Sequence, residues 1–244
     1  MSSAGAAGAA GGAPNVSEVH QARWARALEG CPVVAIVRGI RPAEVLEVAR
    51  ALVSEGIRIV EVPLNSPDAL ESIRLLADAD LGEDVMVGAG TVLTPEDVDL
   101  VAKAGGSLIV SPNMDEQVIR RTKVLGLVSF PGVATPTEAF AALRYGADGL
   151  KAFPGEQIPP NIIKAWRAVL PADTCLVPVG GVSTDNMQDY WNSGASGFGV
   201  GTSLFKPGDG AREARAKAAA FVAAFRRLSG PGGPRAAKRA RTCQ

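Results

Sequence analysis

The sequence predicts an α/β fold, a TIM (β/α)8 barrel in a single domain with an N-terminal helix. The chain has 244 residues, 47% of them hydrophobic, which suits one barrel of about 250 residues. Short apolar runs alternate with segments of helical period, as in repeated βα units that build a parallel sheet. Eight such runs can be counted, and eight βα units close naturally as a barrel.

The predicted strands follow one another at regular intervals along the chain. They are Val33 to Val37, Ile57 to Val62, Val85 to Gly88, Leu108 to Val110, Leu127 to Phe130, Gly149 to Phe153, Cys175 to Val179, and Gly197 to Gly201. An open doubly wound sheet is the alternative, and its dinucleotide-binding form carries G-x-G-x-x-G after the first strand. Here that strand ends in Arg38-Gly39-Ile40-Arg41, so the pattern is missing and the barrel is favoured.

The joints between the strands carry signals for helix starts and ends. Three joints offer a hydroxyl N-cap followed by proline at the first helical position: Ser66-Pro67, Thr94-Pro95 and Thr135-Pro136. Glycines predict where helices end, namely at Gly56, Gly126, Gly146 and Gly194. These signals place a helix after most of the predicted strands.

Both ends of the chain differ in composition from the middle. Residues 1–17 form an Ala/Gly-rich leader and residues 230–244 a Gly/Pro-rich and then basic tail, and we expect both to be disordered. The barrel is expected over residues 18–229. The basic run Arg235 to Arg241 is interpreted as part of a short solvated tail and is assigned no role.

Composition argues against several classes of partner. Lys and Arg total 25, as do Asp and Glu, so no excess of positive charge favours nucleic acid. No apolar run approaches the roughly 18 residues that cross a bilayer. Three distant cysteines suggest neither disulfides nor a zinc site, and a cytoplasmic location is expected. A single histidine, His20, cannot supply a histidine-held metal site. Composition does not exclude magnesium held by carboxylates, but no metal or cofactor is expected.

Two charged residues interrupt predicted strands, Lys151 and Glu61. Parallel barrel strands are buried on both faces, and barrel active sites form at the C-terminal ends of strands, where both residues lie. An apolar setting favours the neutral amine of a lysine, whose ordinary pKa is ~10.4, and a neutral amine can attack a carbonyl. A carboxylate nearby can carry protons. The alternative is that the two form a buried structural ion pair.

Other residues at the predicted strand ends suit a substrate with two anionic groups. Arg38 and Thr91 follow the first and third strands and would bind a carboxylate, although Arg38 alone could equally belong to a surface salt bridge. The loops after the seventh and eighth strands carry Gly180, Gly181, Gly201 and Thr202. Barrels often bind phosphate at these two loops, while the simpler interpretation is that the glycines make tight turns.

Five motifs in order resemble those of the 2-keto-3-deoxy-6-phosphogluconate and 6-phosphogalactonate aldolases, over about Ala27 to Arg227. They are Glu61-Val-Pro-Leu-Asn-Ser-Pro67, Gly88-Ala-Gly-Thr-Val92, Ser111-Pro-Asn113, Leu150-Lys-Ala-Phe-Pro154 and Val179-Gly-Gly-Val182. The resemblance implies a homotrimer of TIM barrels with no cofactor, in which Lys151 forms a Schiff base and Glu61 is the general acid/base. The loop Phe153-Pro154-Gly155-Glu156 departs from the small polar residues frequent in the family.

The same resemblance assigns the remaining site residues. Arg38, Thr91, Pro112 and Phe153 would line the pyruvate end, and the four residues of the glycine loops would bind the phosphate of a keto-deoxy sugar acid. Asn65 and Val179 are similar to the residues at these positions in the galactonate branch of the family. The gluconate branch usually has arginine at the first position and threonine at the second. A threonine could hydrogen-bond the C4 hydroxyl of one epimer and a valine cannot, so both positions are expected to set specificity.

Three alternatives stay open. The substrate could be 2-dehydro-3-deoxy-6-phosphogluconate or 4-hydroxy-2-oxoglutarate. The barrel could be a phosphate-binding isomerase or synthase in which Lys151 only contacts substrate charge. It could also be a non-catalytic barrel that binds sugar phosphates through its glycine loops.

Overall fold

A computed structural model describes residues 15–229 of the chain. The predicted disordered tail, and all but the end of the predicted leader, lie outside these residues. The first helix, α1 (Val16–Gly30), begins two residues before the predicted boundary at residue 18. Asn15 caps it, accepting a hydrogen bond from the backbone N–H of Glu18 at 2.9 Å. This capping interaction explains why the last two residues of the predicted leader are helical.

The described residues contain nine parallel strands. Each of the eight predicted runs overlaps one of them, although β2 and β3 extend one and two residues past the predicted ends at Val62 and Gly88. The strands are β1 (Val33–Ile36), β2 (Ile59–Pro63), β3 (Met86–Gly90), β4 (Leu108–Val110), β5 (Val128–Phe130), β6 (Gly132–Val133), β7 (Leu150–Ala152), β8 (Leu176–Pro178) and β9 (Phe198–Val200). The short strand β6 was not predicted. Only Pro131, which has no N–H to donate, separates it from β5.

The strands form a curled parallel sheet in two parts. Six strands pair in the order β5-β4-β3-β2-β1-β9, and three pair in the order β6-β7-β8. At one junction β5 continues into β6 through Pro131, and at the other a single parallel bridge pairs Val179 with Gly199. The arrangement is an α/β fold with a strongly curled parallel sheet, and complete closure as an eight-stranded barrel stays a prediction.

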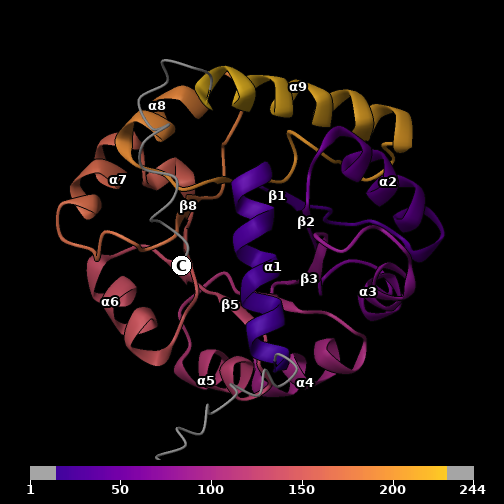
Figure 1. The fold of residues 1–244 in the computed structure, drawn as a ribbon, viewed down its shortest axis with the longest axis horizontal. Helices are drawn as coiled ribbons and strands as arrows, with labels where there is room; N and C mark the ends of the chain where they lie inside the picture. The colour runs from indigo at the N-terminus through magenta and orange to yellow at the C-terminus, as the bar shows by residue number, and fades with distance from the viewer. Residues whose placement is uncertain (1–14, 230–244) are drawn as a thin grey trace, which may run out of the picture.

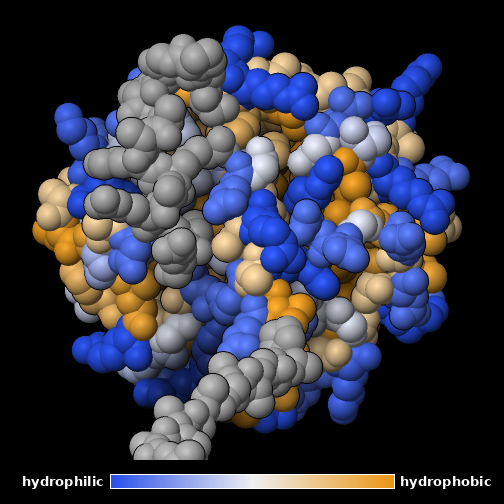
Figure 2. Space-filling model, in the orientation of Figure 1, coloured by the Kyte–Doolittle hydropathy of each residue, from blue (hydrophilic) through white to orange (hydrophobic). Residues whose placement is uncertain are grey.

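Helices surround the strands (Figure 1). They are α2 (Pro42–Glu55), α3 (Ala69–Asp78), α4 (Pro95–Lys103), α5 (Glu116–Val124), α6 (Pro136–Tyr145), α7 (Pro160–Arg167), α8 (Met187–Ser193) and α9 (Ala211–Ser229), with a short 3-10 helix η1 (Gly155–Gln157). None of the described helices is long and apolar enough to span a membrane. Polar side chains cover much of the face seen in Figure 2.

Two of the three predicted helix starts are confirmed. Thr94 and Thr135 cap α4 and α6 through their hydroxyls, each followed by proline. The prediction for Ser66 is wrong, because α3 begins at Ala69 after Asp68, whose φ is 45°. The hydroxyl of Ser66 instead accepts a hydrogen bond from the backbone N–H of Gly39 at 2.9 Å.

Helix ends agree better with the sequence. Gly56, Gly146 and Gly194 are left-handed C-caps of α2, α6 and α8. At the end of α5 the cap is Leu125, and Gly126 follows it with a φ of 70°. Glycine suits these positions because it adopts positive φ without steric strain.

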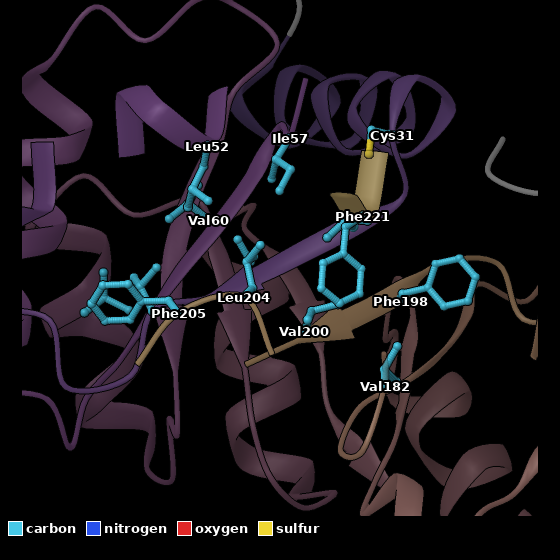
Figure 3. Close-up of a cluster of buried hydrophobic side chains, with 14 of the residues drawn as sticks. Cys31, Leu52, Ile57, Val60, Val182, Phe198, Val200, Leu204, Phe205 and Phe221 are labelled. Carbon is cyan, nitrogen blue, oxygen red and sulfur yellow. The ribbon is translucent and has the colours of Figure 1, made fainter. Parts of the chain in front are cut away.

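Two apolar cores hold the fold together. The outer core lies between strands and helices, and Figure 3 shows part of it, with Leu52 of α2 and Phe221 of α9 near β1, β2 and β9. The inner core contains Trp24 of α1, whose ring centroid is 5.6 Å from that of Phe130. Helix α1 crosses the centre of the ring of helices in Figure 1.

Helix α1 covers the N-terminal ends of the strands. Trp24 packs in one cluster with Met86, Leu108 and Val128, the first residues of β3, β4 and β5. The ring of His20 contacts the carbonyl oxygen of Gly126, just before β5, at 3.0 Å. One end of the curled sheet is therefore closed by a helix, which leaves the C-terminal ends of the strands for a site.

Candidate active site

Glu61 and Lys151 both point into the interior of the curled sheet. Glu61 lies in β2 with 1% of its surface exposed, and Lys151 lies in β7 with 5% exposed. In register, Glu61 is beside Ile36, and Lys151 is beside Val177. Ile36 and Val177 belong to the inner core, and residues in register project from the same face of a sheet. The structure thus brings the two predicted charged residues to one enclosed space.

The carboxyl of Glu61 is protonated more easily than an ordinary one. Burial raises its pKa from 4.5 to about 7, against the charges of Lys151 and Arg38, which lower it. Its Oε2 is buried and accepts no hydrogen bond among the described residues. A carboxyl with a pKa near neutrality can both accept and return a proton under physiological conditions.

The amine of Lys151 is shifted toward its neutral form. Burial lowers its pKa, the charge of Glu61 raises it, and the charge of Arg38 lowers it further. Its Nζ lies 4.6 Å from the centre of the Phe153 ring. No nitrogen–oxygen distance of 4.0 Å or less joins Lys151 to Glu61, so the pair is not the close structural ion pair of the alternative interpretation.

Gly90 makes room for the carboxylate of Glu61, a role that we did not predict. A Cβ atom at Gly90 would lie 2.0 Å from Oε2 of Glu61, far inside van der Waals contact. Gly90 is paired with Pro63 at the ends of β3 and β2. The sequence did carry a signal, because glycine inside a strand weakens it and often marks a close approach.

The loops after β1 and β2 are joined by two hydrogen bonds. Nη1 of Arg38 donates to Oδ1 of Asn65 at 2.5 Å, beside the bond from Gly39 to Ser66. Arg38 was predicted to bind a carboxylate, and Asn65 to set specificity. In the structure Asn65 orients Arg38, and the charge of Arg38 acts on Lys151 and Glu61 alike.

The other residues predicted for the pyruvate end also follow strands. Thr91 comes directly after β3 with a φ of 57°, which is unusual for a β-branched residue and is a feature of strained functional positions. Pro112 follows β4, and its carbonyl oxygen packs against Gly132, where a Cβ would be 2.2 Å away. Phe153 follows β7 and packs on the inner core. Parallel strands place all of these residues at one end of the sheet.

The loops predicted for phosphate lie at the same end. Gly180 and Gly181 follow β8 with φ values of 104° and 65°, so the chain requires glycine there. Gly201 and Thr202 follow β9, which the bridge between Val179 and Gly199 places beside β8. Val179, predicted for specificity, is 5% exposed and belongs to the inner core. Backbone N–H groups in such turns can bind an anion.

The carboxylate of Glu156 lies against Gly180, which the sequence did not predict. A Cβ on Gly180 would lie 2.6 Å from its Oε2. The sequence carried one signal for this position, because the resemblance implies small polar residues in this loop and Glu156 is acidic.

Across the described part of the chain, no group of three or more His, Cys, Asp or Glu side chains could hold a metal ion.

Most of the chain is similar to proteins of one known family. The family model "Aldolase: KDPG and KHG aldolase" matches residues 25–215. The chain is 45% identical over 195 residues to the 2-dehydro-3-deoxy-6-phosphogalactonate aldolase of Escherichia coli (strain K12), covering 80% of this chain and 95% of that protein. It is 47% identical over 195 residues to a probable enzyme of the same name from Rhizobium meliloti (strain 1021), covering 80% and 91%.

A solved structure described as native KDPGal superposes with a TM-score of 0.78 at 45% identity, covering 80% of this chain and 95% of the other. The family model spans most of the chain, and the sequence relatives are aligned over nearly their full lengths. The chain therefore belongs to the KDPG and KHG aldolase family.

Proposed function

We propose that this protein is a class I aldolase that cleaves 2-dehydro-3-deoxy-6-phosphogalactonate to pyruvate and D-glyceraldehyde 3-phosphate. The observation that carries the proposal is the buried Lys151, whose pKa is lowered, in the same enclosed space as Glu61, whose pKa is about 7. Membership of an aldolase family and the names of the two relatives support the substrate.

The proposed reaction begins at the ketone of the substrate. The neutral amine of Lys151 attacks C2, and the resulting carbinolamine loses water to give a protonated imine. Glu61, directly or through a water molecule, takes the proton of the C4 hydroxyl. The C3–C4 bond breaks, its electron pair moves into the imine, and the aldehyde leaves an enamine on Lys151.

The second half of the reaction restores the enzyme. Glu61 returns its proton to C3 of the enamine, which becomes the imine of pyruvate. Water adds to this imine, pyruvate is released, and Lys151 is again a free amine. A carboxyl with a pKa near 7 suits both transfers, because neither form is strongly favoured at neutral pH.

The substrate would lie across the C-terminal ends of the strands. Its carboxylate would bind near Arg38 and Thr91, with Pro112 and Phe153 around the pyruvate carbons. Its phosphate would bind the backbone N–H groups of the loops after β8 and β9, that is, Gly180, Gly181, Gly201 and Thr202. No metal or organic cofactor has a part in this scheme.

The architecture completes the proposal. We propose one domain over residues 18–229 in which the sheet closes as an eight-stranded barrel, with the Val179–Gly199 bridge and the β5–β6 passage as the two junctions. We also propose a homotrimer. Exposed Leu100 lines a groove of about 440 Å³ together with Leu64 and Leu70. The rim also carries Asp68, Glu71 and Asp97, so a second copy would cover the leucines and bring polar or basic groups to the carboxylates. Light scattering would measure the mass of the protein in solution, and a mass other than three times that of one chain would contradict the trimer.

Trapping with borohydride tests the nucleophile. Borohydride added with pyruvate reduces the imine, so we expect a covalent adduct on Lys151 of the wild type and none in Lys151→Ala. Lys164, exposed on α7, offers a control, and Lys164→Ala should keep the adduct. If Lys151→Ala turned over at nearly the wild-type rate, the Schiff-base mechanism would be wrong.

A coupled assay of pyruvate release tests the substrate. Both C4 epimers of the 6-phosphate should be compared with 4-hydroxy-2-oxoglutarate. We expect the galactonate epimer to have the highest kcat/KM, because Val179 offers no hydroxyl to the C4 hydroxyl of the other epimer. Preference for the gluconate epimer would contradict the assignment, and binding without pyruvate release would favour the non-catalytic alternative.

A further inference from the structure

The short helix η1 follows β7, and its first residue is held against the end of β8. The backbone N–H of Gly155 donates to the carbonyl oxygen of Val179 at 2.7 Å. A Cβ at Gly155 would lie 2.3 Å from the carbonyl oxygen of Gly180, so the two backbones touch. The hydroxyl of Tyr190 in α8 donates to the carbonyl oxygens of Gly155 and Ile158 at 3.1 and 3.3 Å. The backbone that carries Glu156 is therefore fixed on both sides.

From this position the side chain of Glu156 lies along the loop after β8. Its Oε2 is 2.6 Å from where a Cβ of Gly180 would be, and its Oε1 is 3.5 Å from the corresponding point of Gly181. The charge of Glu156 also acts on Tyr190 of α8, whose pKa is raised by burial and, to a smaller extent, by this charge. The two glycines thus leave space that a carboxylate occupies.

In the described part of the chain, no cationic side chain forms an ion pair with this carboxylate. Among the described residues, no Lys, Arg or His nitrogen lies within 4.0 Å of a Glu156 oxygen. A phosphate monoester has a second pKa of about 6 and carries close to two negative charges at neutral pH. A phosphate bound by the N–H groups of Gly180 and Gly181 would lie next to a like charge, which weakens its binding.

We propose that Glu156 determines specificity at the far end of the substrate by disfavouring a doubly charged phosphate. This inference rests on the proposed function, which places the substrate phosphate at these glycines. Glu156 then reduces the difference in KM by which a phosphorylated substrate is favoured over an unphosphorylated one. The reduction increases as pH rises through the second pKa of the phosphate, because the repulsion grows with its charge.

The test compares Glu156→Gln, which keeps the shape and removes the charge, with Glu47→Gln. Glu47 is exposed on α2, and its substitution makes the same change in net charge away from the glycine loops. The measurements are kcat and KM for 2-dehydro-3-deoxygalactonate with and without its 6-phosphate, at pH 5.5 and 7.5. Calorimetry of inorganic phosphate gives a direct affinity.

We expect Glu156→Gln to lower KM for the phosphorylated substrate by about threefold or more at pH 7.5, and by less at pH 5.5. KM for the unphosphorylated substrate should not change. The Kd of inorganic phosphate should fall as KM does, and Glu47→Gln should leave every value unaltered. An unchanged or higher KM for the phosphorylated substrate, or an equal fall in Glu47→Gln, would overturn the inference.

Failure of the inference can be told from failure of the proposed function. Pyruvate carries no phosphate, so borohydride trapping of pyruvate on Lys151 does not depend on Glu156. If the wild type neither traps pyruvate nor cleaves the phosphorylated substrate, the proposed function is wrong. The phosphate affinities of Glu156→Gln and the wild type then still decide the inference, because they require no turnover.

Discussion

The substitution Glu61→Gln measures how strongly the site acts on its buried carboxyl. Burial raises the pKa of Glu61 from 4.5 to about 7 in the folded protein. Since one pKa unit corresponds to about 1.36 kcal/mol, ionising this group makes the fold less stable by about 3 kcal/mol. Glutamine has a similar shape and no charge, so the variant escapes this loss.

The sign of the pH dependence follows from the direction of the shift. The folded state holds the proton of Glu61 more tightly than the unfolded state, so the contribution of this group to the stability of the wild type is full below about pH 4.5. This contribution is lost as pH rises through about 7. The free energy of unfolding of Glu61→Gln minus that of the wild type should therefore increase by about 3 kcal/mol between pH 4.5 and pH 8.

Urea unfolding at constant ionic strength over this range would give the difference. An unpaired amide N–H in the variant would lower its stability by about 1–3 kcal/mol at every pH, so the slope and not the offset is the test. The control Glu47→Gln should show no slope. A difference for Glu61→Gln that stays constant with pH would refute the raised pKa.

Four further outcomes are expected. Wild-type kcat/KM should rise with pH through about 7 as Glu61 loses its proton, and Glu61→Gln should lack that limb and lose about 100-fold or more in kcat. Lys151→Met should abolish trapping of pyruvate, yet unfold at a higher urea concentration, because an apolar chain replaces a buried amine. Gly90→Ala should lower the free energy of unfolding by about 1–3 kcal/mol and should also lower kcat, because the new Cβ would overlap the Glu61 carboxylate. The control Gly30→Ala should change neither quantity, because the space around Gly30 is open. Val179→Thr should raise the ratio of kcat/KM for the gluconate epimer to that for the galactonate epimer by about tenfold, and an unchanged ratio would argue against this position as the filter.

Local patterns predicted the strands and the two charged residues for physical reasons that operate within a few residues. A buried parallel strand is a short apolar run, so Lys151 between Leu150 and Ala152 is visible as an exception in sequence alone. The direction of parallel strands also places every strand end on one side. The hydroxyl and proline of Thr94-Pro95 act on the adjacent turn, and this helix start was predicted correctly.

The sequence-based predictions were wrong or incomplete where a segment contacts another segment that is distant in sequence. Ser66 has the sequence of a helix cap, but Gly39 of the neighbouring loop uses its hydroxyl, and α3 starts later. The hydrogen bond that Asn65 accepts from Arg38 was not predicted, and the role of Asn65 in specificity stays a prediction. Neither contact follows from spacing, because the partners are 27 positions apart.

By itself, then, the sequence determined the βα repeat, the end of the sheet where the candidate site lies, and the presence of two buried charged residues, Lys151 and Glu61. These depend on hydrophobic period and strand direction, which are local. Only the tertiary structure decided that Gly90 must leave space for Glu61, and that Glu156 lies against Gly180 and Gly181. Such contacts depend on the curl of the sheet, which brings loops that are distant in sequence together. No local sequence pattern encodes this curl.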